Sequence, residues 1–468
     1  IILGTNSIKD TGFDVANSCR FNSGSSDRLN RTLGTPTNNL KWTYSFWIKR
    51  SKLGEEVAIT EAINNSQNKG LILFRSDDQL EIIDLISDSY AMQKKTNRKF
   101  RDVSAWYHIV FSNDSTVGSP DLKIYVNGVE ETSLATDNEY SQNQAGSFNS
   151  ALANHIGASA SSRFSNCYFS EFVFIDGQQL AADQFGEFDS DSGIWKPIDV
   201  SGLTAGTNGF YLDFEDSSNL GNDVFGGTDL TEVNLAATDQ STDTCTNNFC
   251  TMNPLENYYQ AATLTEGNLK LLTATSSNTA PSLATFALTK GKWYYEAKYV
   301  SDSLAASSGA IGIVGTQVTS AAGSGMLETA QKYGLYLNDG DIWYNNSKVQ
   351  ELGAHIDHTA TIGIALDFDN NRITFSIDGG WGDGSGNWDE SSPHTYYTVA
   401  APSAVDFGAY FPAFGDWSSG SIGYEINFGC PMYAISSSNS DADGFGNFEY
   451  AVPSGHFAIC TKNLAEYG

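Results

Sequence analysis

The sequence predicts an all-β protein built from two β domains of similar construction. In 361–379, apolar residues alternate with small or polar ones on both sides of an Asp-Asn-Asn cluster at 369–371, the pattern of a β-hairpin with one buried face. The same unit occurs half a chain earlier, where 106–111 and 122–126 flank a polar stretch and end at an Asn-Gly turn, 127–128. The 468 residues include 12% aromatic residues and 44 Gly, and no long helical pattern is present. We therefore expect two or three domains made of short strands.

The first domain is predicted to begin at residue 13, after a short mixed stretch, 1–12, that we interpret as an N-terminal tether. Because the sequence starts with Ile-Ile-Leu and has no initial Met, we expect a processed chain or a fragment of a longer protein. Residues 41–49 place Trp42, Tyr44 and Phe46 on one face, as a core strand should. Further strands are predicted at 70–74, 80–83, 106–111, 122–126, 154–158 and 169–175, with a returning strand at 209–214.

Several of these segments together resemble a laminin-G or concanavalin-A-like jelly roll. The order of SFWIKRS, AWYHIVFSND, LKIYVNGVE, IGAS and EFVFIDGQ carries the resemblance over about 13–188. It implies two packed antiparallel sheets. We assign 13–235 to this domain, with the strand at 209–214 returning to its sheet.

The second domain is predicted over 264–468. Residues 291–299 alternate as another core strand, and more strands follow at 310–314, 333–337, 341–344, 361–379, 409–414 and 421–428. The succession KWYYEA, GIVG, YGLYLNDG, IGIALDFDNNRITFSIDG, YFPAF and INFG resembles a SPRY domain, another concanavalin-like sandwich. That resemblance implies a recognition module that uses loops at one end of the sandwich and has no catalytic chemistry of its own.

The segment between the two domains, 236–263, is predicted to be a connector rich in Asx and Gly. It overlaps a longer stretch, 189–253, that has little alternation and many Asp, Asn, Thr and Gly residues. We interpret it as an ordered linker whose Asx residues cap turns, with a binding loop as the alternative. This stretch resembles a connector in structural proteins of marine bacteriophages, and the ending GFGNFEYAVPSG…ICTKNL resembles the tail of phage-encoded members.

Charge, apolar runs and cysteine content limit the partners, the membrane contacts and the cysteine chemistry that we expect. The chain has 26 Lys and Arg against 55 Asp and Glu, giving a net charge of −29, so we expect no nucleic-acid and no anionic-membrane partner. No run of eighteen apolar residues occurs, so no transmembrane helix and no membrane insertion are expected. The six Cys are too few for a disulfide scaffold and lack zinc-site spacing, which predicts mostly free, buried thiols.

The sequence lacks the motifs of the common hydrolases. Glycoside hydrolysis needs two carboxylates across a cleft, but Glu81 and Asp84 are three apart on a strand and therefore point to opposite faces. Neither a Gly-x-Ser-x-Gly elbow nor a His-Glu-x-x-His motif occurs. His355 and His358 have no third metal ligand nearby in sequence. We therefore expect no enzymatic activity and no catalytic residues.

Calcium is the one cofactor that the sequence suggests. The stretch 367–378 begins like an EF-hand loop, but Arg372 occupies the sixth position where Gly is needed, and we interpret it as a hairpin. A better candidate lies at 439–447, with Gly444 at the sixth position and oxygen ligands from Asn439, Asp441, Asp443 and Asn447. Tyr450 stands where a bidentate Glu is usual, and the alternative is a polar turn.

The insertion at 379–397, GGWGDGSGNWDESSPHTYY, has the composition of a sugar-binding loop. A lectin needs an exposed aromatic platform beside amide or carboxylate groups, and neither tryptophan of the insertion has an obvious core position. The alternative is a loop that folds its own tryptophans against the sandwich or against a neighbouring subunit. The candidate ligand-binding residues are Trp381, Asp383, Asn387, Trp388, Asp389 and Tyr396, with Trp417 from a separate segment.

Together, the resemblances imply a non-enzymatic virion surface protein of a marine bacteriophage: a tail fibre, spike or decoration that binds a host-surface glycan or protein. Its other partners would be virion proteins and copies of itself, with a trimer as one such homo-oligomer. It would be assembled in the host cytoplasm and be extracellular in the mature virion. The alternatives are a purely structural virion assembly protein, a glycan depolymerase and a bacterial adhesin.

Overall fold

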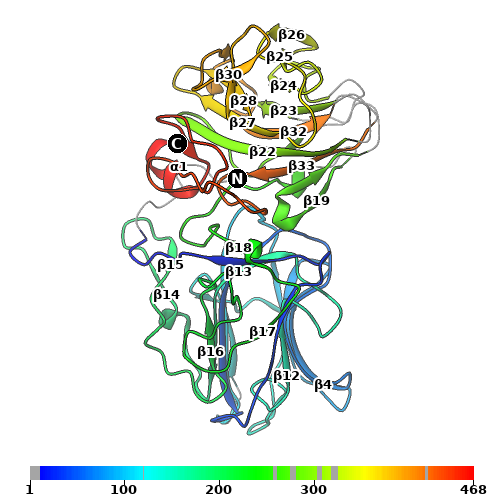
Figure 1. Cartoon of the computed structure of the whole chain (residues 1–468). Helices are drawn as coiled ribbons and strands as arrows, with labels where there is room; N and C mark the ends of the chain where they lie inside the picture. The colour runs from blue at the N-terminus through cyan, green and yellow to red at the C-terminus, as the bar shows by residue number, and fades with distance from the viewer. Residues whose placement is uncertain are drawn as a thin grey trace. The chain divides into compact units, whose positions relative to one another are not determined.

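The computed structural model describes residues 11–119, 121–256, 261–274, 281–302, 308–317, 325–416 and 420–468. These residues divide into two compact units, 11–246 and 247–468 (Figure 1). The boundary between the units lies inside the segment predicted as a connector, 236–263. Residues 236–246 belong to the first unit and 247–263 to the second.

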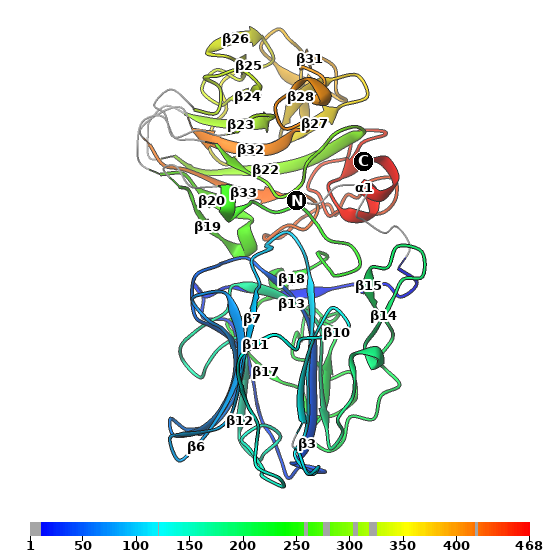
Figure 2. The same cartoon turned by 180° about the vertical axis from the view of Figure 1, so that it is seen from behind.

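Two antiparallel sheets form the first unit, and Figure 2 shows them face to face. One has the order β10 (Val129–Glu130), β9 (Asp121–Val126), β8 (Tyr107–Asp114), β3 (Lys41–Arg50), β13 (Cys167–Asp176), β1 (Ser18–Phe21) and β18 (Gln240–Ser241). The other has the order β11 (Leu134–Asn138), β7 (Ser89–Lys99), β6 (Gln79–Ile86), β5 (Asn68–Phe74), β4 (Val57–Asn65), β12 (Ala153–Ile156), β2 (Arg28–Thr32) and β17 (Thr231–Val233).

The core of the first unit follows from period-two alternation. In β9, Leu122, Ile124 and Val126 are buried while the residues between them are half-buried, so one face of the strand enters the core between the sheets. The returning strand β16 (Phe210–Leu212) pairs with β13. A small hairpin of β14 (Gly186–Phe188) and β15 (Trp195–Pro197) follows β13 along the chain, separated from it by a short 3-10 helix, η2 (Ala182–Gln184).

The second unit also contains two main sheets. The larger has the order β19 (Thr263–Thr265), β20 (Lys270–Leu272), β33 (Ile422–Asn427), β22 (Lys292–Asp302), β27 (Thr361–Asp367), β28 (Arg372–Ile377), β29 (Gly380–Gly382) and β30 (Trp388–Glu390), with β31 (Tyr397–Thr398) beside β28 and β34 (Phe457–Ala458) beside β22. The smaller has the order β21 (Ser282–Leu283), β32 (Phe411–Asp416), β23 (Gly309–Val314), β24 (Lys332–Tyr336), β25 (Asp341–Tyr344) and β26 (Ser347–Gln350).

Helices are few among the described residues. The single α-helix, α1, covers Thr461–Tyr467, and the remaining 3-10 turns are η3 (Ala237–Asp239), η4 (Pro254–Glu256), η5 (Glu266–Asn268) and η6 (Pro402–Ala404). No helix in the described ranges is long and apolar enough to cross a bilayer. The predicted all-β class with antiparallel sheets is confirmed.

Both predicted hairpins are confirmed. β27 and β28 pair from Ile362–Ile377 to Asp367–Arg372, and the Asp367 carboxylate closes the turn by accepting hydrogen bonds from Asn370 and Arg372. β8 and β9 pair in the same antiparallel manner. The predicted buried thiols are also confirmed, because all six cysteines are thiols and five of them are buried.

Candidate functional site

The predicted sugar-binding insertion begins as a continuation of the larger sheet of the second unit. Asp378 and Gly379 have φ values of 49° and 84°, the left-handed geometry of a tight two-residue hairpin turn. β29 then pairs back onto β28, with Trp381 opposite Ser376, and β30 adds a further strand. The insertion therefore starts as ordered sheet, and its polar part follows at 383–395, which we call the rim loop.

Trp381 is a core residue, which corrects its prediction as an exposed aromatic platform. Its side chain is only 4% exposed and belongs to the main hydrophobic cluster of the second unit. Its ring centroid lies 6.4 Å from that of Tyr294 on β22. Pairing of β29 with the sheet places this side chain on the face that packs into the core. Of the two interpretations left open by the sequence, folding against the sandwich holds for Trp381.

Trp388 is half-buried and attaches the rim loop to a neighbouring segment. Its indole Nε1 donates a hydrogen bond to the Ala354 carbonyl at 3.0 Å. The ring lies so close to Gly353 that a Cβ at that position would overlap it. Glycine is therefore required there for close approach of the backbone. Trp381 thus fixes the start of the insertion in the core, and Trp388 attaches its middle to the 353–354 segment.

The acidic residues of the rim loop have different roles. The Asp383 carboxylate accepts hydrogen bonds from the backbone N–H of Ser385 at 2.6 Å and from Asn387 through its backbone and side chain. The Asn387 side-chain hydrogen bond is the largest cause of the lowered pKa of Asp383, so this carboxylate is an ionised turn cap. Asp389 is exposed at the surface of β30.

Tyr396, another predicted ligand-binding residue, packs against a cation. One face of the Tyr396 ring is covered by the Arg372 guanidinium, whose Cζ lies 3.9 Å from the ring centroid. Trp417 lies outside the described residues. The structure thus places Asp383, Asn387 and Trp388 in one loop and gives Tyr396 a cationic neighbour of its own.

The predicted calcium loop forms a tightly bonded polar turn. Asp441 is buried, and its carboxylate accepts from the N–H groups of Asp443, Phe445 and Ala458 and from the Asn463 side chain. Asp443 accepts the Tyr467 hydroxyl at 2.9 Å, while the Asn439 amide donates to the Glu449 carbonyl. In the part of the chain that is described, no three His, Cys, Asp or Glu side chains gather in a metal-binding group. Calcium binding through Asn439, Asp441, Asp443 and Asn447 stays a prediction.

The two carboxylates considered for glycoside hydrolysis have separate surroundings. Asp84 is buried and accepts the Tyr140 hydroxyl and the Ser147 N–H, both at 2.6 Å. Glu81 instead accepts from Gln93 at 2.8 Å and pairs with Arg75. The prediction that Glu81 and Asp84 point to opposite faces of β6 agrees with these different partners.

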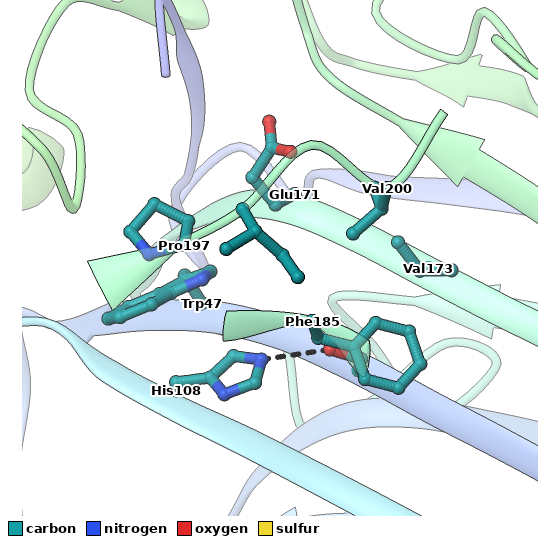
Figure 3. A pocket seen from close by; sticks show the side chains of 9 residues that line it. Trp47, His108, Glu171, Val173, Phe185, Pro197 and Val200 are labelled. Atoms are coloured by element: carbon teal, nitrogen blue, oxygen red, sulfur yellow. Dashed lines mark hydrogen bonds between the residues drawn. The ribbon is translucent and has the colours of Figure 1, made fainter. Parts of the chain in front are cut away.

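A buried polar cluster that sequence reasoning missed lies in the first unit (Figure 3). His108 on β8 contacts Ser45 on β3 through Nε2 at 2.9 Å, and the Trp195 Nε1–H donates to His108 Nδ1 at 3.0 Å. Because an indole nitrogen can only donate, Nδ1 must be the acceptor and Nε2 must carry the proton. His108 therefore donates to Ser45 and cannot act as its general base. Burial lowers the pKa of His108 to about 3.

Glu171 lies beside the same polar cluster, in a strained backbone conformation. Its φ is 49°, and it lies at a register shift in the pairing of β13 with β3, which indicates a β-bulge. The Tyr211 hydroxyl donates to its carboxyl at 2.6 Å, and burial raises the pKa of Glu171 to about 8. In Figure 3 its carboxyl points away from His108. A charged residue inside the apolar run CYFSEFVFID was the sequence signal for this site.

We expect Ser45 to be unreactive toward a fluorophosphonate probe that labels activated serines. The reason is the protonated Nε2 of His108, which leaves Ser45 without a base to accept its proton. Mass spectrometry of the labelled full chain measures the modification. Adduct formation at Ser45 that disappears in a His108→Gln variant would contradict the assigned tautomer.

Comparisons with known proteins bear on the fold. A family profile described as the concanavalin A-like lectin/glucanases superfamily matches residues 23–180, within the first unit. No curated protein sequence matches the chain.

Three solved structures are among those that match the chain. The SPRY domain of human HERC1 is 15% identical, with coverage of 39% of this chain and 99% of that domain and a TM-score of 0.29. A suggested carbohydrate-binding protein from Bacteroides ovatus is 14% identical, with coverage of 47% and 58% and a TM-score of 0.32. A heptameric SAP-like pentraxin from Limulus polyphemus is 17% identical, with coverage of 37% and 81% and a TM-score of 0.28. At these identities and TM-scores the neighbours carry no argument about a ligand.

Proposed function

We propose that this chain is a non-enzymatic recognition protein whose second unit binds a glycan or a protein through the rim loop. The observation that carries the proposal is the anchoring of that loop, with Trp381 in the core and Trp388 hydrogen-bonded to Ala354. A loop that is attached to the sandwich at its start and at Trp388 loses less conformational entropy when it binds, so its polar groups act as a preorganised surface.

The chemistry of the rim loop suits hydroxyl-rich ligands. Carboxylate and amide groups bind sugar hydroxyls, and Asp389 and Asn387 are both exposed. Trp388 is half-buried and offers the uncovered part of its ring to the apolar face of a sugar. The family profile over 23–180, whose superfamily includes lectins, supports a carbohydrate ligand for the chain through its first unit and does not bear on the rim loop.

The resemblances of the connector and of the chain's ending support a finer proposal. We propose that the protein is a bacteriophage virion component of marine origin, acting as a tail fibre, spike or decoration in host attachment. Its partners would then be other virion proteins, further copies of the chain, and a host-surface glycan or protein outside the cell. A map of the intact particle that shows no density for this chain would contradict the virion assignment.

We expect Asp389→Ala and Trp388→Ala each to weaken binding to host cells or to a glycan on an array by about tenfold. Asp389→Ala removes a carboxylate acceptor at an exposed site, so its melting temperature should match that of the unchanged protein. Asp191→Ala, an exposed acid of the first unit, is the matched control.

Two outcomes of that experiment would count against the proposal. Absence of binding to any cell or glycan by the unchanged protein would favour a structural role. Release of reducing ends from a host polysaccharide would instead establish a depolymerase.

A further inference from the structure

A cavity in the second unit shares no lining residue with the rim loop and has no assigned role. Its volume is about 520 Å³, within the range of small-ligand pockets. It opens between η4, the segment from β21 to residue 289, and the turn that leads into β32. We call it the apolar cleft, and its walls are formed by Leu255, Leu283, Ala287, Phe407, Ala409 and Phe411.

Two large apolar side chains at the cleft remain in contact with solvent. Leu255 is 56% exposed and Phe407 is 39% exposed, although most side chains of their type in this unit are buried. Exposed apolar side chains that gather at a concavity mark a site where a partner removes them from water. A ligand that covers these side chains gains the free energy of burying them, which folding of the chain alone does not provide.

The aromatic wall of the cleft is preorganised. The Phe407 N–H donates to the Gly315 carbonyl at 3.0 Å, and its ring packs edge-to-face on Phe411 with centroids 5.6 Å apart. The preceding Asp406 accepts from Thr316 at 2.6 Å and from Gln331 at 3.1 Å. This turn is therefore fixed before any ligand arrives, which lowers the entropy cost of binding.

The polar groups of the cleft select the charge of its ligand. Glu256 is half-buried, and among the described residues its carboxylate makes no ion pair. Asn253 accepts the Leu255 N–H through its side-chain oxygen. Glu256 is the one charged residue among those that line the cleft. The whole chain carries a net charge of −29, which adds an attraction for cations and opposes anions.

We propose that the apolar cleft binds a peptide segment of a partner protein that inserts one bulky apolar side chain beside a Lys or Arg. The apolar side chain packs against Phe407, Phe411 and Leu255, while the cation reaches the Glu256 carboxylate at the edge. This site is independent of the proposed function of the rim loop. It gives the second unit two separate binding surfaces, one polar and one apolar with an acidic edge.

The test is an array of immobilised heptapeptides that carry Phe, Trp or Leu at the centre, flanked by Lys, Ser or Glu. The full chain should bind the Lys-flanked peptides best, and raising the salt from about 0.05 M to about 0.5 M should weaken that binding severalfold because charges at the edge are screened. Phe407→Ala should weaken it by about tenfold, because it removes the aromatic wall. Glu256→Gln should remove the preference for Lys over Ser while retaining apolar selectivity.

Matched variants separate the cleft from unfolding and from the rim loop. Phe188→Ala changes an exposed phenylalanine of the first unit, 52% exposed, and should leave peptide binding unchanged. Trp388→Ala should also retain it, although it weakens binding at the rim loop. The proposal is overturned if no peptide is retained, if Phe407→Ala binds as well as the unchanged chain, or if Glu-flanked peptides bind as tightly as Lys-flanked ones. The proposal is also overturned if the unchanged chain binds a glycan but no peptide, and Phe407→Ala loses that glycan binding.

Discussion

Replacing Glu171 by Gln is expected to stabilise the first unit at pH 8 and to remove a pH dependence of its stability between about pH 4.5 and pH 8. Burial raises the pKa of Glu171 from its ordinary value of 4.5 to about 8. Between these two values the folded state holds a proton that the unfolded state has released. Stability therefore falls as the pH rises through this window, and the loss is complete above the folded pKa.

The size of this effect follows from the shift. One pKa unit corresponds to about 1.4 kcal/mol, so the cost at pH 8 is on the order of a few kcal/mol. Gln cannot ionise, yet its side-chain oxygen can still accept the Tyr211 hydroxyl that Glu171 accepts at 2.6 Å. The variant should therefore be most favoured over the unchanged protein at pH 8 and show little advantage at pH 4.5.

Urea unfolding at several pH values between 4.5 and 8 measures this difference directly. Glu130→Gln, which makes the same change at an exposed site of the same unit, is the matched control. A Glu171→Gln protein that is less stable at every pH would contradict the argument. It would mean that the ionised carboxylate is held by favourable contacts in the fold.

Replacing Trp381 by Ala should lower the free energy of unfolding of the second unit by about 3–5 kcal/mol. The side chain is 4% exposed and packs in the main core cluster, so truncation leaves a cavity in addition to the lost transfer free energy. The start of the rim loop should loosen as well, because β29 continues the sheet through this residue.

Calorimetry of the full chain can follow the two units as separate transitions. Trp381→Ala should lower the transition of the second unit and leave that of the first unit in place. Trp381→Phe should recover part of the loss, and Trp388→Ala should cost less because that side chain is only half-buried. Unchanged stability with lost ligand binding would instead place Trp381 on the binding surface.

Much of the fold could be predicted because strand alternation is a local pattern. The predicted segment 41–49 matches β3, and the predicted hairpins match β8–β9 and β27–β28. Each of these elements buries one face, so a period of two in the sequence reports the side that enters the core. The positive φ values of Asp378 and Gly379 also follow from a local pattern, because an Asp-Gly pair favours a tight hairpin turn.

The functional groups were harder to predict because their surroundings come from distant parts of the chain. His108 obtains its tautomer from Trp195, which lies 87 residues further on, and Glu171 obtains its hydroxyl partner 40 residues away. The apolar cleft joins residues near 255, 285 and 407. No pattern within a short window encodes such contacts.

The sequence by itself determined the all-β class, the main core strands and the position of the polar insertion, because these depend on alternation and turn chemistry between near neighbours. Only the tertiary structure decided which tryptophan of that insertion is buried, since burial depends on the strand against which β29 pairs. It also decided which carboxyl groups lose their solvent, because the segments that cover them come from elsewhere in the chain. The pattern of neighbouring residues therefore specified the sheets, and packing between distant segments specified the sites.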